Sequence, residues 1–247
     1  MKKYFDRLLD FLFPTHIKCI FCQAEMLKPT PEMICEECEG VVLRVTNPCR
    51  ICGTEVATGL SICYRCDKEK IYLKAGVSAF QYSDSVIYAI SKFKYDNGKY
   101  LAPFMAASIF KSFETRKFVF NNDCLVVPVP LCHRNYKKRG YNQSTLLAKE
   151  FIKLSKTKLE LSEDALIRIK DTDNQVGLDR KQRAENMSGA FCAVSKIVDK
   201  KTVLLVDDVL TSGATANECA KALLKGGAKE VILLTYASSA LQPKHVK

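Results

Sequence analysis

Apolar residues from residue 75 onwards follow two alternating spacings along the chain. Short runs of branched and aromatic residues predict strands, at 75–82, 125–130, 204–206 and 231–236. Recurrence every three or four positions predicts helices between the strands, at 85–95, 101–113, 142–155 and 214–225. Strands that alternate with helices indicate an α/β fold, a parallel sheet flanked by helices. In the first of these helices the positions expected to face the core are Val86, Ile87, Ile90 and Phe93.

The stretch from Val203 to Thr215 combines a buried-type strand, two adjacent acids and a short hydroxyl-rich loop before a helix. The first N–H groups of a helix lack backbone acceptors, and the helix dipole favours an anion there. We therefore expect a phosphate at the loop formed by Thr211, Ser212, Gly213, Ala214 and Thr215. Asp207 and Asp208 would reach a polyhydroxylated or metal-bearing group beside that phosphate. The competing interpretation, a solvated acid pair that caps an ordinary helix, explains only part of this arrangement.

A cationic segment follows the predicted strand 125–130, which must end at its prolines. Ligands of parallel sheets bind beyond the C-terminal ends of the strands, so this segment should share a crevice with the paired acids. We expect a loop that binds pyrophosphate through Arg134, Lys137, Lys138 and Arg139. A solvated basic turn is the alternative. The neighbouring rings of Tyr136 and Tyr141 would also suit single-stranded nucleic acid, whose bases stack on aromatic side chains.

The polar segment 171–186 is long and contains a glycine, which is typical of a mobile lid before the strand-like stretch 189–194. If residues 179–186 are helical, Arg180 and Arg183 share one face and offer a fork for phosphate. An exposed linker helix fits the local sequence equally well.

Eight of the twelve cysteines form four Cys-x-x-Cys pairs within residues 14–70. Two such pairs complete a tetrahedral Cys₄ zinc site, and zinc would supply folding free energy where large apolar residues are few. The simplest pairing predicts two consecutive zinc ribbons, with interleaved pairing as the alternative. The sites have no position left for a catalytic water, so we expect the zinc to be structural. Redox-active disulfides are the alternative, but four Cys-x-x-Cys pairs exceed what one exchange reaction needs. The expected ligands are Cys19, Cys22, Cys35 and Cys38 in one site and Cys49, Cys52, Cys63 and Cys66 in the other.

The formal net charge of +11 stays positive even when eight thiolates bind two zinc ions, which agrees with a polyanionic ligand. No apolar run approaches the roughly 18 residues that span a bilayer, so we expect no stable membrane insertion. Residues 1–13 predict an amphipathic helix docked on the protein, with a membrane-surface anchor as the alternative. Charges interrupt their apolar run and no small-residue cleavage site follows, so a cytoplasmic protein is expected. Residues 242–247 form a short tail.

Residues 203–215 resemble the signature of type I phosphoribosyltransferases, and the whole chain resembles the ComF family of competence-associated proteins. The resemblance rests on the double zinc ribbon, Lys94-Tyr95 and the segments 127–130, 139–143, 171–186, 189–191 and 206–215. It implies a type I phosphoribosyltransferase-like domain over 71–241 beside a small N-terminal zinc-ribbon module over 14–70. In such transferases the paired acids hold the ribose hydroxyls of phosphoribosyl pyrophosphate (PRPP), and the loop after them holds its 5′-phosphate. The basic loop would hold pyrophosphate, and Mg²⁺ would accompany PRPP.

The ComF resemblance further implies a role in natural transformation, in which single-stranded DNA that has entered the cytosol is handled alongside a helicase-like partner. Three functions follow as hypotheses. The first is a PRPP-binding competence protein that assists this handling of DNA. The second is an active phosphoribosyltransferase of nucleotide metabolism, for which the sequence assigns no acceptor. The third, a purely structural adaptor, has no use for the intact Asp207-Asp208 pair and its phosphate loop.

Overall fold

The computed structural model describes residues 17–95, 97–118, 123–170 and 180–239, without the side chains of residues 180, 181, 183 and 184. Its centre is a parallel five-stranded sheet in the order β1-β7-β6-β2-β3. These strands are β1 (Ala75–Gln81), β2 (Cys124–Pro128), β3 (Glu160–Leu161), β6 (Thr202–Leu210) and β7 (Glu230–Ser238). The predicted α/β fold is therefore confirmed, and four of its five strands lie where they were predicted, whereas the two-residue edge strand β3 was not predicted.

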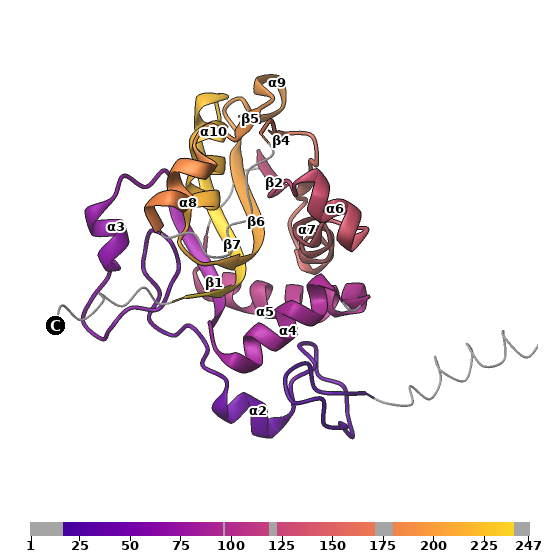
Figure 1. Cartoon of the computed structure of the whole chain (residues 1–247). Helices are drawn as coiled ribbons and strands as arrows, with labels where there is room; N and C mark the ends of the chain where they lie inside the picture. The colour runs from indigo at the N-terminus through magenta and orange to yellow at the C-terminus, as the bar shows by residue number, and fades with distance from the viewer. Residues whose placement is uncertain (1–16, 96, 119–122, 171–179, 240–247) are drawn as a thin grey trace, which may run out of the picture.

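Helices cover both faces of the sheet (Figure 1). One face packs against α4 (Asp84–Lys94), α5 (Ala102–Thr115) and α7 (Gln143–Leu154), and the short 3₁₀ turn η1 (Gly98–Leu101) joins the first two of these helices. The opposite face packs against α10 (Ala214–Lys225) and an antiparallel pair of short strands, β4 (Leu166–Arg168) and β5 (Phe191–Ala193). Alternate residues of the central strands supply the two cores, since successive side chains of a strand point to opposite faces. The remaining helices are α2 (Glu36–Val41), α3 (Tyr64–Lys68), α6 (His133–Arg139), α8 (Arg180–Met187) and α9 (Ser195–Val198).

Two local predictions were wrong. In α4 the side chain of Ile87 is 37% exposed, and the smaller Ala89 takes the inward position. The buried stripe, which follows the helical repeat of 3.6 residues per turn, consists of Val86, Ala89, Ile90 and Phe93. The prediction chose the larger Ile87 over Ala89, although the position on the helix and not the size of the side chain decides which residue is buried. The segment expected to be a basic loop forms α6, because no helix breaker occurs before Gly140, whose left-handed backbone (φ 72°) ends the helix.

The cysteine-rich region is built onto the open edge of the sheet at β1. Between the two cysteine clusters the chain runs antiparallel to β1, where Val45 N–H donates to the Ala79 carbonyl at 3.1 Å. The main chain at Cys52 and Gly53 packs directly against the main chain at Gly76, since a Cβ on Gly53 would overlap the backbone of Gly76 and a Cβ on Gly76 would overlap the backbone of Cys52. Phe21, beside the first cysteine cluster, packs edge-on against Phe80 with ring centroids 5.4 Å apart. The region thus shares its core with the sheet, while the domain boundaries at residues 70 and 71 stay a prediction.

Within the described ranges, no helix combines the length and apolar character needed to cross a membrane. The amphipathic helix expected at residues 1–13 and the tail at 242–247 lie outside the described residues.

Candidate functional site

The paired acids lie near the carboxyl end of β6, the central strand of the sheet, which pairs with β7 on one side and β2 on the other. Asp208 is 3% exposed, and its Oδ2 forms an ion pair with Lys94 Nζ at 2.7 Å. Burial alone would lower the pKa of Lys94, but the charge of Asp208 and the hydrogen bond to it outweigh burial and raise that pKa. The ion pair thereby offsets part of the cost of burying these two side chains.

Asp207 is half-buried and accepts hydrogen bonds at Oδ1 from Ser144 Oγ (3.0 Å) and from the Asp208 N–H (2.9 Å). Burial, and then the negative charge of Asp208, raise the pKa of Asp207 to about 7. The two hydrogen bonds and Lys94 act in the opposite direction and are weaker. A carboxyl group poised near neutrality responds strongly to a ligand, because a cation or a hydroxyl donor favours its ionised form.

The 211–215 loop connects β6 to α10 as predicted. Gly213 adopts a left-handed backbone (φ 78°) at the N-cap of α10, a conformation that only glycine adopts without strain. The loop lines a small hollow of about 30 Å³ together with Asp207, Leu233 and Thr235. N–H groups at the helix start and hydroxyls around one hollow form an arrangement that suits an anion.

Among the cations of α6, Arg139 lies close enough to Lys94 for its positive charge to act towards a lower pKa of that lysine. Its Nη1 donates to Gln143 Oε1 at 2.8 Å, and its guanidinium lies 5.3 Å from the Tyr95 ring centroid. Its Nε is buried and has no hydrogen-bond partner within the described part of the chain. The other three cations of α6, Arg134, Lys137 and Lys138, are exposed.

The predicted phosphate fork is only partly visible. Residues 180–187 do form helix α8, close to the predicted range. The side chains of Arg180 and Arg183, and the preceding residues 171–179, lie outside the described residues. Their assignment stays a prediction.

A cavity of about 340 Å³ opens beside the end of β2, between α6 and the residues around β4. Its lining combines apolar, aromatic and cationic side chains, namely Leu131, Cys132, His133, Tyr136, Arg168, Ile169 and Lys170. Because β2 and β6 are neighbours and parallel, this cavity lies at the same edge of the sheet as the acids.

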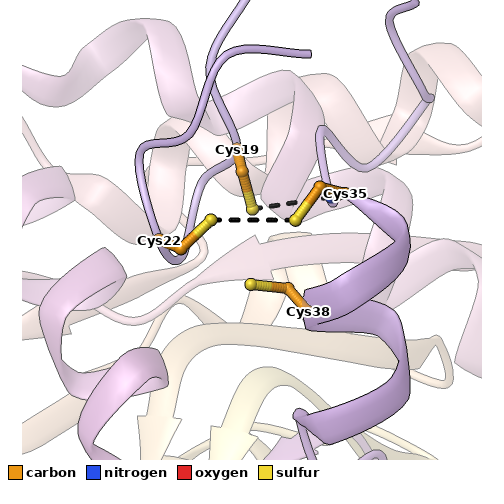
Figure 2. Close-up of side chains that lie close together, drawn as sticks. All are labelled: Cys19, Cys22, Cys35 and Cys38. Atoms are coloured by element: carbon orange, nitrogen blue, oxygen red, sulfur yellow. Dashed lines mark hydrogen bonds between the residues drawn. The ribbon is translucent and has the colours of Figure 1, made fainter.

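The eight paired cysteines gather into two groups of four, each with its sulfur atoms within 4.8 Å of one another. The first Cys₄ group is Cys19, Cys22, Cys35 and Cys38 (Figure 2), and the second is Cys49, Cys52, Cys63 and Cys66. Consecutive pairing of the Cys-x-x-Cys motifs is thus confirmed and interleaving is excluded.

The geometry of both groups fits zinc. Tetrahedral zinc with bonds of about 2.3 Å places its sulfur ligands about 3.8 Å apart. The Cys22–Cys35 and Cys52–Cys63 sulfurs lie 3.7 Å and 3.6 Å apart. In the second group the Cys63 N–H points at Cys49 Sγ (3.3 Å), which stabilises a thiolate. Four soft sulfur donors leave no open position, so each group would hold a structural ion.

Comparison with known proteins matches both parts of this structure. Residues 138–246 match the phosphoribosyl transferase domain family, and residues 8–67 match the double zinc ribbon domain family. Competence protein F of Haemophilus influenzae is 29% identical over 87% of this chain and 94% of its own length. Competence protein ComFC of Bacillus subtilis is 24% identical over 85% and 89%, and the DNA utilization protein YhgH of Salmonella typhimurium is 26% identical over 80% and 87%. The chain therefore resembles the ComF family over most of its length. The region that matches the phosphoribosyl transferase domain family holds the acids and the 211–215 loop.

Sequence reasoning about this site gave no role to Lys94 or Ser144, although the structure shows that Lys94 pairs with Asp208 and Ser144 donates to Asp207. Both come from helices distant in sequence, and no local pattern links residue 94 or 144 to residues 207–208. The Tyr141 hydroxyl bonds the Phe93 carbonyl and so joins the start of α7 to the end of α4. Asn142 caps α7 and donates to the Val129 carbonyl at 3.0 Å, which fixes α7 to the end of β2. The Lys94-Tyr95 pair of the family resemblance was the one available signal.

Proposed function

We propose that this protein binds PRPP with Mg²⁺ at the carboxyl end of β6 and assists the handling of incoming single-stranded DNA during natural transformation. The observation that carries the proposal is the placement of Asp207 and Asp208 directly beside the anion-type loop at the start of α10. Carboxylates that accept from hydroxyls, next to N–H groups that donate to phosphate, match the two ends of a ribose 5-phosphate.

In this proposal the 5′-phosphate lies in the 211–215 loop and the ribose hydroxyls bond to Asp207 and Asp208. Lys94 would hold the Asp208 carboxylate in position through their 2.7 Å ion pair. Mg²⁺ would bind with PRPP beside Asp207 and Asp208 and would supply positive charge to the pyrophosphate. Arg139 would meet the pyrophosphate with its unpartnered Nε, aided by the remaining cations, Arg134, Lys137, Lys138, Arg180 and Arg183.

The exposed cations of α6 would contact the phosphates of a DNA strand while Tyr136, 51% exposed, offers a ring on which a base can stack. The names of the relatives, competence proteins and DNA utilization proteins, support this part of the proposal. A cytoplasmic location and a helicase-like partner belong to the same proposal, because the incoming strand would be handled there. The basic net charge of +11 agrees with such a ligand.

A second candidate is phosphoribosyl transfer to an acceptor. It is favoured by the cavity of about 340 Å³ beside the end of β2, which offers space next to the proposed pyrophosphate site. In that reaction the bond from C1 of the ribose to pyrophosphate breaks, and a bond from C1 to the acceptor nucleophile forms. Nearby cations would stabilise the departing pyrophosphate.

Calorimetric titration with PRPP and Mg²⁺ tests the binding. Asp208→Asn keeps the shape of the side chain but removes the charge that pairs with Lys94, so affinity should fall at least about tenfold. Asp164→Asn, at an exposed acid away from the site, should bind as the wild type does. A wild type that binds no PRPP would refute the proposal.

A matched pair of double variants tests the DNA part. Lys137→Gln with Lys138→Gln should weaken binding of single-stranded DNA and lower the dependence of its affinity on salt, because fewer counterions are released. Lys225→Gln with Lys229→Gln removes the same charge from exposed positions at the other end of the sheet and should change little. If both double variants lost the same affinity for single-stranded DNA, the DNA would not bind specifically at α6.

A further inference from the structure

An arginine of the second Cys₄ group reaches into the 211–215 loop. Arg65 lies between the ligands Cys63 and Cys66, is 3% exposed, and donates from Nη1 to the Ser212 carbonyl at 2.6 Å. Its guanidinium occupies the space where a Cβ of residue 213 would stand, so the glycine there is required by this contact as well as by its φ of 78°. Buried arginine is rare without defined partners. Here the partners are a carbonyl of the predicted phosphate loop and, on the metal side, the sulfur of Cys66.

The direction of this hydrogen bond decides where the loop can bind an anion. A trans peptide holds its carbonyl oxygen and the following N–H on opposite sides. When Arg65 fixes the Ser212 carbonyl towards the cysteine cluster, the Gly213 N–H points the other way. An anion needs converging N–H groups that point outward from the protein.

A second support acts on the neighbouring carbonyls. Ser239 donates from its N–H to the Leu210 carbonyl (2.9 Å) and from Oγ to the Thr211 carbonyl (3.4 Å). The Ser239 carbonyl in turn accepts from Thr54 Oγ1 (3.1 Å), two residues beyond the ligand Cys52. Three successive carbonyls of this stretch are therefore held from the side of the second Cys₄ group.

We propose that Arg65 is a positioning residue for anion binding, through which the metal-loaded second Cys₄ group holds the 211–215 loop in its phosphate-binding form. The inference rests on the proposed function for the identity of the ligand, but the effect of Arg65 on the loop can be measured without any ligand. The four sulfurs of the group fit zinc, and α3 with Arg65 begins directly at the ligand Cys63. Loss of the metal frees α3 and with it the donor to Ser212.

The chain provides a matched control. Arg50 lies between Cys49 and Cys52 in the other half of the same Cys₄ group, but its side chain is exposed. Arg50→Met and Arg65→Met thus remove one charge each from the same metal site. Only Arg65→Met removes a hydrogen bond to the 211–215 loop.

The first measurement is amide hydrogen exchange in the zinc-loaded, ligand-free protein. We expect exchange at residues 212–215 to become about tenfold faster in Arg65→Met, the factor that corresponds to loss of one charge-assisted hydrogen bond. Arg50→Met should exchange as the wild type does, and Arg65→Lys, which keeps a donor, should recover part of the protection. Equal exchange in Arg65→Met and Arg50→Met, with two zinc ions bound in each, would overturn the inference.

The second measurement is the affinity for inorganic phosphate and for PRPP with Mg²⁺, which should fall about tenfold in Arg65→Met. If the wild type binds neither ligand while the exchange result stands, the proposed function fails and the positioning role survives. If the wild type binds PRPP and the Arg65 variants match it in affinity and exchange, the positioning role fails alone.

Zinc content is measured for every variant. Arg65→Gln replaces Arg65→Met if the latter loses zinc. Loss of zinc from both, with zinc retained in Arg50→Met, would show that Arg65 serves the metal site rather than the loop and would also overturn the inference.

Discussion

The two Cys₄ groups share their ligands and geometry but differ in what they touch. In the first group Cys22 is exposed and Cys35 half-buried, whereas all four cysteines of the second group are buried. The first group packs on the face of α4 and α5, and Gln23 beside it accepts from Lys92 of α4. The second group packs on the face of α10 and contacts the 211–215 loop through Arg65.

The difference shows how one repeated motif can serve two purposes. The first group stabilises the outer edge of the fold through an ion network in which Arg44 bridges Glu32 and Glu39, and Lys111 of α5 joins Glu32. The second group instead contacts the candidate site, through the hydrogen bond from Arg65 to Ser212. Asn217 of α10 adds to this contact, because it accepts from the Tyr72 N–H and donates to the Lys70 carbonyl, in the segment that follows the second group.

The largest expected effect comes from removing one ligand of each group. Cys52→Ser should lower Tm by more than about 10 °C, because a structural zinc site contributes about 10–16 kcal/mol to folding and this thiolate is fully buried. Cys22→Ser, at an exposed ligand, should lower Tm by less than half of that amount. Calorimetric Tm and zinc content of the two variants provide the comparison.

The same two variants also separate the roles. Cys22→Ser should keep its phosphate affinity, and Cys52→Ser should lose it at temperatures where both are folded. A loss of affinity in Cys22→Ser equal to that in Cys52→Ser would remove the distinction between the groups.

An intermediate effect is expected in the ion network of the first group. Burial alone would raise the pKa of Glu32, but hydrogen bonds from Arg44 and Lys111 outweigh burial and hold that pKa below its usual value. Arg44→Met leaves the Glu32 carboxylate poorly compensated and should cost about 2 kcal/mol near pH 7.

The sign with pH follows from the lowered pKa of Glu32. Its stabilising contribution is present above the ordinary carboxyl pKa of about 4.3 and is lost as pH falls through the lowered value. The difference in Tm between wild type and Arg44→Met should therefore narrow from pH 7 to pH 3. Phosphate affinity should not change, which a titration at pH 7 checks. A difference that widens in acid would contradict this account.

The two regions also differ in how far sequence alone could predict them. Ligand spacing predicted both Cys₄ groups, because four sulfurs close together in sequence satisfy the metal locally. The alternation of apolar spacings predicted the sheet for the same local reason. The Arg65–Ser212 and Lys94–Asp208 contacts join residues more than 100 positions apart, and only the folded chain brings them together. Arg65 gave no signal, since an arginine inside a zinc knuckle is usually a solvated cation.

The smallest expected effect lies on the site side of the comparison, at Asp207. Burial and the charge of Asp208 raise the pKa of Asp207 to about 7, so the folded protein favours its neutral form. The contribution of Asp207 to the free energy of unfolding should be fully present below the ordinary carboxyl pKa of about 3.9 and should be lost as pH rises towards 7. This dependence is opposite in sign to that of Glu32. The fall should be about 1 kcal/mol, less than the full pKa shift implies, because the half-buried carboxylate retains contact with water.

Asp207→Asn should abolish this pH dependence, and Asp164→Asn, at an exposed acid, should retain it. Denaturant unfolding of the three proteins between pH 4 and pH 8 provides the measurement. Added PRPP and Mg²⁺ should reverse the trend in the wild type, because a bound cation favours the ionised carboxylate and binding then strengthens as pH rises through 7. If the stability of Asp207→Asn depended on pH as that of the wild type does, the titrating group would not be Asp207. The site beside the second Cys₄ group would then contain no carboxyl group that titrates near pH 7.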